Sequence, residues 1–417
     1  MIKKHVWEIL LVVFFLMNNL YGKPQIIGSK VLSGDQFNAS DIFSANLFID
    51  KENDIVIEVE GPDCLWLNNK WVTTKQYGYF LNGFVKDGVV NLVFKPDEQH
   101  IDIYSVKKNI ILEQHIPIGD FPTYPGPVQV IYVPGDTNGF YLLGSQEQFP
   151  RNPGEFMATV ASGGHGIYYI KPVWAEIKGQ TLLKRENVPY GGKADESYRV
   201  EKVLTGKDAI YLLGFRAQEQ RSSGSGDKPP TPVISHYAEY DMNKKTLVRV
   251  QNVYENTPRY ELGVTNEHIN YFYGTVSADN RDDGNTVVVF SWIRDRFIYT
   301  GNAGIEDDVV QSQIYYAQCG KGKFNGVEKI GEGFIPLVKV DSLGNVHVIW
   351  VNNNGSLVHR AKKDGKWGDE EFFLNGVDNS KTKRFGKYIC AEFDKDNNLN
   401  VVFLSNEQFV YAKIRAD

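Results

Sequence analysis

The sequence predicts an all-β protein, a seven-bladed β-propeller built from four-stranded antiparallel blades. Three observations lead to this prediction. A turn-and-strand phrase recurs along the chain, a second strand phrase follows most of its copies, and aromatic residues reach 13%, largely in short alternating runs. Aromatic enrichment and alternation with a period of two are typical of strands.

The first phrase is a hairpin. Residues 340–351, VDSLGNVHVIWV, place Asp341 before Gly344-Asn345 and then alternate apolar residues. Similar phrases begin at Asp394 and at Asp50, and residues 281–290 give a further copy, RDDGNTVVVF. Because Asp bonds to its own backbone and Gly or Asn accepts a positive φ, each copy predicts a tight turn followed by a strand.

The second phrase is an aromatic strand that recurs five times, at 167–169, 235–238, 314–317, 358–361 and 409–412. A further strand after a polar turn completes a four-stranded meander, the unit of a propeller blade. The predicted blades cover residues 45–78, 80–117, 127–190, 198–255, 267–333, 335–375 and 386–417. The last of them has three strands, so we predict that residues 25–32 supply its fourth and remove the exposed edge.

The N-terminus is typical of a secretory signal. Lys3 and Lys4 precede an apolar run from Ile9 to Met17, and the stretch ends at the small residue Gly22. The run is too short to span a bilayer, and the alternative is a buried N-terminal strand or helix. We therefore expect a signal peptide over 1–22 and a single domain over 23–417, secreted or periplasmic, without a membrane span and monomeric.

Charge and cysteine content narrow the range of partners. The net charge of −6 argues against nucleic acid as a partner. Cys64, Cys319 and Cys390 lie far apart, so they allow at most one internal disulfide, and buried strand cysteines are the favoured interpretation. No Cys/His spacing indicates a zinc site.

The hairpins and aromatic strands resemble the BNR, or sialidase-like, propeller superfamily, and this resemblance covers the whole mature chain. The nearest stretch to an Asp-box of that superfamily is 280–287, NRDDGNTV, which lacks the usual Ser and the closing aromatic. No Arg-Ile-Pro stretch and no arginine triad is found, which disfavours a true sialidase. The resemblance implies a propeller of the polysaccharide-lyase or glycosidase type, with no specific family assigned.

Three long stretches are predicted between the second and third strands of blades 3, 4 and 5, at 145–166, 215–232 and 293–310. These connections leave one face of a propeller, and long loops in compact domains are functional or disordered. We expect them to form a ligand pocket, with solvated loops as the alternative. The residues expected to bind an acidic or neutral saccharide are Arg151, Arg221, Arg294, Arg296 and Tyr299.

Catalysis, if present, is expected at His165, which stands between glycines in SGGHG. It would serve as base or acid, Tyr168 would take the opposite role, and Arg216 would neutralise a uronate carboxylate during β-elimination. An exposed turn histidine is the alternative. His236, His347 and His359 fall on the repeated strands, where packing explains them.

No cofactor is expected; calcium, if it binds, would be held at Asp282-Asp283 or Asp307-Asp308, acids that are otherwise solvated. The predicted function is an exported propeller that binds a polysaccharide or oligosaccharide and either cleaves it, by lyase or hydrolase chemistry, or only binds it. The alternative is a non-catalytic protein-interaction platform or a lectin-like propeller.

Overall fold

The computed structural model describes the strands and most of their turns. The described residues are 26–32, 41–42, 44–122, 128–134, 139–148, 169–188, 197–206, 209–217, 233–256, 260–262, 267–280, 286–300, 304–320, 323–374, 376–377, 388–405 and 408–415. Their regular structure is almost entirely β-strand, with a short 3-10 turn at Lys75–Tyr77. No helix in this part of the chain is long and apolar enough to cross a membrane.

Seven antiparallel sheets confirm the predicted seven-bladed β-propeller. The chain divides into two compact units: unit 1 holds residues 1–73 and 333–417, and unit 2 holds residues 74–332. Blades 1, 6 and 7 belong to unit 1, and blades 2 to 5 belong to unit 2. Every blade lies within a few residues of its predicted range.

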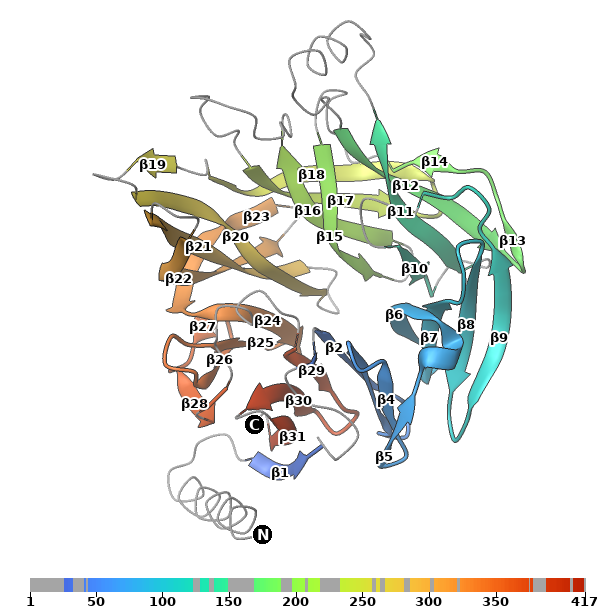
Figure 1. The fold of residues 1–417 in the computed structure, drawn as a ribbon, viewed down its shortest axis with the longest axis horizontal. Helices are drawn as coiled ribbons and strands as arrows, with labels where there is room; N and C mark the ends of the chain where they lie inside the picture. The colour runs from blue at the N-terminus through green and yellow to red at the C-terminus, as the bar shows by residue number, and fades with distance from the viewer. Residues whose placement is uncertain are drawn as a thin grey trace, which may run out of the picture. The chain divides into compact units, whose positions relative to one another are not determined.

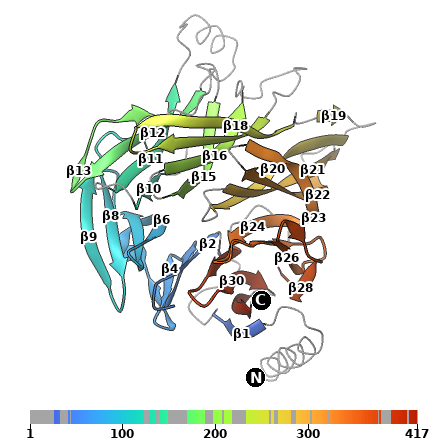
Figure 2. The ribbon, with the colours of Figure 1, turned by 180° about the vertical axis from the view of Figure 1, so that it is seen from behind.

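Unit 2 contains four consecutive meanders, seen side by side in Figures 1 and 2. Blade 2 consists of β6 (Tyr79–Lys86), β7 (Val89–Lys95), β8 (His100–Val106) and β9 (Ile110–Pro117). Blade 3 consists of β10 (Gln129–Tyr132), β11 (Phe140–Gln148), β12 (Tyr169–Lys178), β13 (Thr181–Leu182) and β14 (Glu186–Asn187). Blade 4 consists of β15 (Ser197–Thr205), β16 (Ala209–Ala217), β17 (Val233–Asp241) and β18 (Thr246–Asn256). Blade 5 consists of β19 (Tyr260–Leu262), β20 (Glu267–Asn280), β21 (Thr286–Thr300), β22 (Gly304–Gly320) and β23 (Lys323–Glu332).

Unit 1 contains the first blade and the last two. Blade 1 consists of β2 (Ser44–Ile49), β3 (Ile55–Glu60), β4 (Cys64–Leu67) and β5 (Lys70–Thr73). Blade 6 consists of β24 (Phe334–Val340), β25 (Val346–Val351), β26 (Leu357–Lys363), β27 (Lys366–Trp367) and β28 (Glu371–Leu374). Blade 7 consists of β29 (Cys390–Phe393), β30 (Asn398–Ser405), β31 (Gln408–Arg415) and β1 (Ile26–Val31).

The N-terminal strand completes the last blade, as the sequence predicts. β1 pairs antiparallel with β31, with Val31 opposite Val410 and Ile26 opposite Ile414, and the two strands lie together in Figure 1. The next residue, Leu32, accepts a hydrogen bond from the Trp71 indole N–H at 2.6 Å, which ties β1 to blade 1. The edge of β31 is therefore covered, and the sheet has four strands.

The predicted Asp turns are confirmed in blades 1, 6 and 7. In each turn Oδ1 of the Asp accepts the backbone N–H groups two and four residues later: from Leu343 and Asn345 at Asp341, and at matching positions after Asp50 and Asp394. The residue three positions after the Asp has a positive φ and is Asn53, Gly344 or Asn397. The copy at 281–285 lies outside the described residues.

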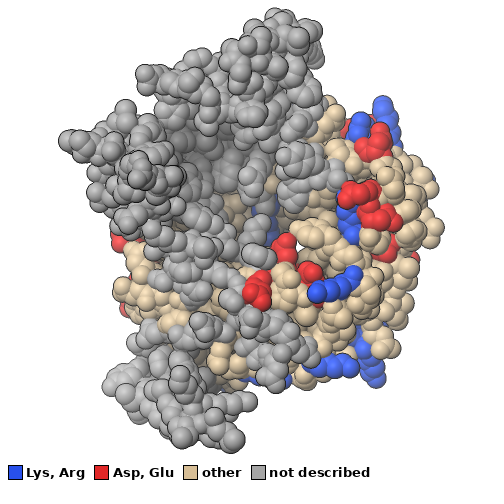
Figure 3. Space-filling view, in the orientation of Figure 1, with Lys and Arg blue, Asp and Glu red and all other residues tan. Residues whose placement is uncertain are grey.

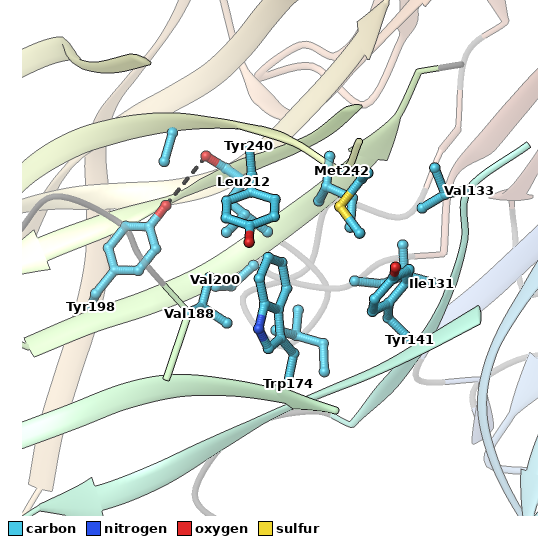
Figure 4. Close-up of a cluster of buried hydrophobic side chains, with 13 residues drawn as sticks. Ile131, Val133, Tyr141, Trp174, Val188, Tyr198, Val200, Leu212, Tyr240 and Met242 are labelled. Atoms are coloured by element: carbon cyan, nitrogen blue, oxygen red, sulfur yellow. Dashed lines mark hydrogen bonds between the residues drawn. The ribbon is translucent and has the colours of Figure 1, made fainter. Parts of the chain in front are cut away.

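Apolar faces hold the blades of unit 2 together. One cluster between blades 3 and 4 contains thirteen buried side chains, ten of them labelled in Figure 4. In it the rings of Trp174 and Tyr240 meet edge to face, with centroids 4.5 Å apart. The Tyr198 hydroxyl donates to the Leu212 carbonyl at 3.2 Å, so its polar end is satisfied within the cluster (Figure 4). Comparable clusters join blade 2 to blade 3 and blade 4 to blade 5.

One expectation about the connections is wrong. Residues 293–310 were expected to form a loop, but β21 and β22 continue through this stretch as one long antiparallel hairpin that pairs as far as Thr300 and Gly304. The alternation in IRDRFIYT is that of a strand, and the pairing satisfies backbone groups that a loop would expose. The expected loops at 145–166 and 215–232 are also shorter at their starts, because β11 runs to Gln148 and β16 to Ala217.

The cysteines and two of the histidines occupy the structural positions expected of them. Cys64, Cys319 and Cys390 lie on strands as thiols, the first two buried and the third half-buried. His347 and His359 are buried within blade 6.

Candidate functional site

Each meander has one edge from which both the connection between its second and third strands and the link to the next blade emerge. We call this the link edge. In blades 1, 2, 5, 6 and 7 the connection there has two to five residues. In blade 3 it runs from 149 to 168, twenty residues, and in blade 4 from 218 to 232, fifteen residues. Two consecutive blades of unit 2 therefore carry long connections at their link edges.

The eight residues predicted for the site fall into two equal groups. His165, Tyr168, Arg151 and Arg221 lie outside the described residues. Arg216 lies on β16, and Arg294, Arg296 and Tyr299 lie on β21, where only the backbone is described. Their roles stay predictions, and so does the calcium alternative at Asp282-Asp283 and Asp307-Asp308. Among the described residues, no three His, Cys, Asp or Glu side chains form a group suited to a metal ion.

The described residues contain an acidic cluster at the link edge of blade 1. Its members are Ser44 and Asn46 of β2 and Glu58 and Glu60 of β3. Ser44 pairs with Glu60 and Asn46 with Glu58 in the ladder, so all four side chains lie on one face of the sheet. The Ser44 hydroxyl donates to Glu60 Oε2 at 2.6 Å, and the Asn46 amide donates to Glu58 Oε2 at 2.9 Å.

The carboxyl groups of Glu58 and Glu60 differ in burial, and burial changes the pKa of Glu58. Glu58 is 1% exposed, and burial raises its pKa to about 8, against a smaller opposing effect of the Asn46 hydrogen bond. The nearby charges of Glu60 and Asp63 raise the pKa further. Glu58 therefore holds a proton at neutral pH, beside a second carboxyl group on the same face of the same strand.

Blades 6 and 7 bring further charged groups into unit 1 on their first strands. Lys339 of β24 forms an ion pair with Glu392 of β29, whose side chain is 39% exposed. Cys390 precedes Glu392 on the same face of β29, and burial raises the pKa of its thiol, with Glu58 among the charges that act on it. Blade 7 thus adds a partly exposed carboxylate, and blade 6 adds the lysine that pairs with it.

A histidine cluster lies at the link edge of blade 2. It contains Asp97, His100, Asp102, Tyr104 and His115. His115 Nδ1 lies 2.6 Å from Asp102 Oδ1, and the Tyr104 hydroxyl donates to Asp102 Oδ2 at 3.1 Å. His100 Nδ1 lies 2.9 Å from Asp97 Oδ1, and the two imidazole rings stack with centroids 4.4 Å apart.

This geometry orients the imidazoles. The Asp102 side chain is 9% exposed, whereas that of His115 is 49% exposed. With Nδ1 directed at a carboxylate, Nε2 of each ring is left for solvent or a ligand. Burial, followed by the Asp102 hydrogen bond, raises the pKa of Tyr104 to about 12, so Tyr104 keeps its proton and serves as a donor to Asp102.

Basic and acidic side chains lie among one another on the described part of the face in Figure 3. The arginines of blades 3 to 5 that are expected to bind the saccharide are residues whose side chains are not described.

Neither cluster was predicted from the sequence. Glu58 and Glu60 alternate with Ile57 and Val59 in the strand IVIEVE, a pattern that is typical of a solvent-facing side, so it gives little signal for the acidic cluster. The histidine cluster gives little signal either, because HIDIY and QHIP begin fourteen residues apart and the β8–β9 register brings them together.

No family model matches the chain. No curated protein matches it either.

Several solved structures are similar to it. A protein of unknown function from Dyadobacter fermentans is 10% identical, over 94% of this chain and 99% of that one, with a TM-score of 0.44. The GH93 α-L-arabinofuranosidase of Fusarium graminearum, solved with arabinobiose, is 11% identical over 94% and 98%, with a TM-score of 0.42. The polysaccharide lyase Uly1 is 8% identical over 84% and 94%, with a TM-score of 0.35. These structures include a glycosidase and a polysaccharide lyase, the types of protein that the sequence resembles, and no specific family is assigned.

Proposed function

We propose that this chain is an exported propeller that binds a polysaccharide and cleaves it at the link edge of blade 1. One observation carries the proposal: Glu58, with its pKa near 8, stands next to Glu60 on one face of β3 at that edge. Glycoside hydrolysis uses a protonated carboxylic acid to protonate the leaving oxygen and a second carboxylate as base or nucleophile.

The spacing of the two glutamates supports these roles. Two-carboxylate mechanisms need carboxyl groups about 5 to 9.5 Å apart, and Glu58 and Glu60 present theirs on the same face of β3, two residues apart. Glu58 is the acid and Glu60 the second carboxyl group, oriented by the Ser44 hydroxyl. Because Glu58 is almost fully buried, the substrate oxygen must approach it from the side of Glu60.

Recognition of the saccharide is proposed for the long connections and for the strands around them. Arg151, Arg221, Arg294, Arg296 and Tyr299 are suited by type to pair with carboxylate or sulfate groups and to stack on a sugar ring. If the substrate carries uronate, β-elimination by His165, Tyr168 and Arg216 is the alternative chemistry.

A panel of neutral and uronate-containing polysaccharides separates these chemistries. Hydrolysis releases reducing ends without ultraviolet absorbance, whereas elimination gives an unsaturated product that absorbs. We expect Glu58→Gln and Glu60→Gln to lose at least about 100-fold in kcat, while Glu52→Gln, an exposed glutamate of the same hairpin, stays unchanged. Unsaturated product that disappears in His165→Ala would instead assign the reaction to elimination.

If no polysaccharide yields product and none retards the protein on an affinity gel, the carbohydrate proposal is wrong and a protein-interaction platform becomes the better interpretation. Export is tested separately by sequencing the N-terminus of the protein from a secreting host. The mature chain should begin just after Gly22 and elute as a monomer.

A further inference from the structure

Blade 6 contains a continuous hydrogen-bonded wire that the proposed function does not use. Asp341 Oδ2 lies 3.3 Å from His347 Nε2, and His347 Nδ1 lies 2.9 Å from His359 Nε2. His359 Nδ1 then lies 2.9 Å from Glu371 Oε2. The wire crosses the blade from the turn before β25, through β25 and β26, to β28.

The two ends of the wire differ in exposure. The side chains of Asp341, His347 and His359 are 1%, 0% and 4% exposed, whereas that of Glu371 is 32% exposed. Phe393 packs edge-on against the His347 ring, and the Phe373 ring lies 5.3 Å from that of His359. The buried end therefore has no water to replace a missing hydrogen bond, while the Glu371 end is open to solvent.

A count of protons shows that two neutral imidazoles and two ionised carboxylates cannot fill the wire. Its three links join ring nitrogens to each other or to carboxylate oxygens, and each link needs one proton between its two heavy atoms. Two neutral imidazoles bring two N–H protons, and two carboxylates bring none. One link would then place a bare nitrogen against a carboxylate oxygen or against another bare nitrogen.

The two buried links keep their protons, so the link that lacks a proton is the outer one, between His359 and Glu371. Asp341 also accepts from the Asn345 amide at 2.9 Å and cannot leave its turn without breaking it. Burial, and then the neighbouring His359, lower the pKa of His347 to about 4, so His347 stays neutral. Its single proton points to Asp341, and His359 Nε2–H fills the middle link, which leaves His359 Nδ1 to face Glu371.

We propose that blade 6 is a proton-binding site: the wire holds a third proton on His359 Nδ1, so that an imidazolium faces the Glu371 carboxylate. Loss of this proton leaves two acceptors 2.9 Å apart, and Glu371 turns into solvent because it is the exposed member. The outer strand β28 is thereby attached to β26 more firmly while the third proton is bound than after it is lost.

The other charged groups around the rings do not supply a proton to the outer link. Lys363, at the end of β26, opposes protonation of His347. Lys339, which pairs with His347 in the ladder, directs its ammonium to Glu392 instead. Asn397 of blade 7 reaches only the Asp341 end, with its amide nitrogen 3.5 Å from Oδ2.

The test has two parts. In the wild-type protein, ¹⁵N spectra of labelled histidine at pH 6 should show both nitrogens of His359 protonated and His347 neutral, with His347→Asn and His359→Asn for assignment. On raising the pH to 9, His359 should lose one proton. A His359 that carries a single proton at pH 6 overturns the proposal.

The second part is Glu371→Gln. A glutamine amide donates to His359 Nδ1 directly, so that two imidazole protons and one amide proton fill the three links at every pH. We expect the thermal midpoint of the wild type to fall between pH 6 and pH 9 by about 2 to 4 °C more than that of the variant. Glu370→Gln, an exposed neighbour outside the wire, should follow the wild type. Glu58 titrates in the same window in all three proteins, so only the differences count. Parallel curves for all three contradict the proposal.

Discussion

The side chain of Asn397 in the turn of blade 7 accepts the backbone N–H of Ser342 in the turn of blade 6, at 2.9 Å. The same relation recurs one blade on, where Asn53 Oδ1 of blade 1 accepts the N–H of Lys395 in the turn of blade 7. In both pairs the acceptor occupies the positive-φ position of its own turn. Asn at this position therefore does two things: it tolerates the backbone conformation and bonds to the neighbouring turn.

Substitutions at Asn397 should separate these two contributions. Asn397→Gly keeps the backbone free but loses the bond to Ser342, at a cost of about 1 kcal/mol. Asn397→Ala loses the bond and also replaces Asn with a residue that tolerates the left-handed region less well, so it should cost about 2 kcal/mol or more. Urea unfolding gives both values. Asp364→Ala, at an exposed position with a φ of 51°, should show the backbone cost alone, and equal costs for the Gly and Ala variants of Asn397 would contradict this account.

Gly333, which precedes β24, is expected to tolerate no side chain. Its φ is +148°, and a Cβ there would collide with the Val351 carbonyl oxygen and lie 2.8 Å from Trp350 Cδ1. Gly333→Ala should therefore cost about 3 kcal/mol or more, or prevent folding. Gly365→Ala, in the same blade at φ +77° with open space around it, should cost only about 1 kcal/mol. Similar unfolding midpoints for the two variants would refute the prediction.

Glu58 should make stability depend on pH. Its folded-state pKa of about 8 lies above the ordinary value of 4.5, so the folded chain binds the proton more tightly than the unfolded chain. The contribution of Glu58 is complete below pH 4.5 and decreases as the pH rises toward 8, by roughly 3 kcal/mol between pH 4.5 and pH 7. Unfolding free energies of Glu58→Gln should lack this decrease. A variant that follows the wild type across the range would place the proton elsewhere.

Removal of β1 should expose a strand edge. A chain that begins at Leu32 leaves β31 unpaired on one side, and we expect it to aggregate and unfold at a lower temperature. A chain that begins at Ile26 keeps the pairing and should behave as the full-length protein does. Light scattering during a thermal ramp distinguishes the two, and equal behaviour would show that β1 adds little.

Much of the fold follows from local rules. Asp341, Asp394 and Asn397 indicate their turns because the bonds that hold them lie within four residues. The assignment of residues 25–32 to blade 7 followed from counting strands, since a three-stranded last blade leaves an edge that another strand must cover. The loop predicted at 293–310 was wrong because charged residues on a long hairpin resemble a polar connection when the pairing is unknown.

The site was harder to predict, because its chemistry depends on burial and register. Glu58 and Glu60 are the same residue type, two positions apart, and they differ in burial. Their burial cannot be predicted from the sequence alone. His347 and His359 were correctly assigned to strands, but their hydrogen bond depends on the offset between β25 and β26. His100 and His115 likewise come together through pairing at Asp102.

The sharing of blade 7 between the two ends of the chain has a consequence for biosynthesis. About 380 residues separate β1 from β31, and ribosomes add roughly 5 to 20 residues per second. β1 must therefore wait on the order of 20 to 80 s for its partner, while earlier hairpins close soon after they are made. If the chain is exported as proposed, β1 is still unpaired, next to the signal peptide, when it reaches the translocation machinery. Blade 7 can be completed only later, once β31 has been made.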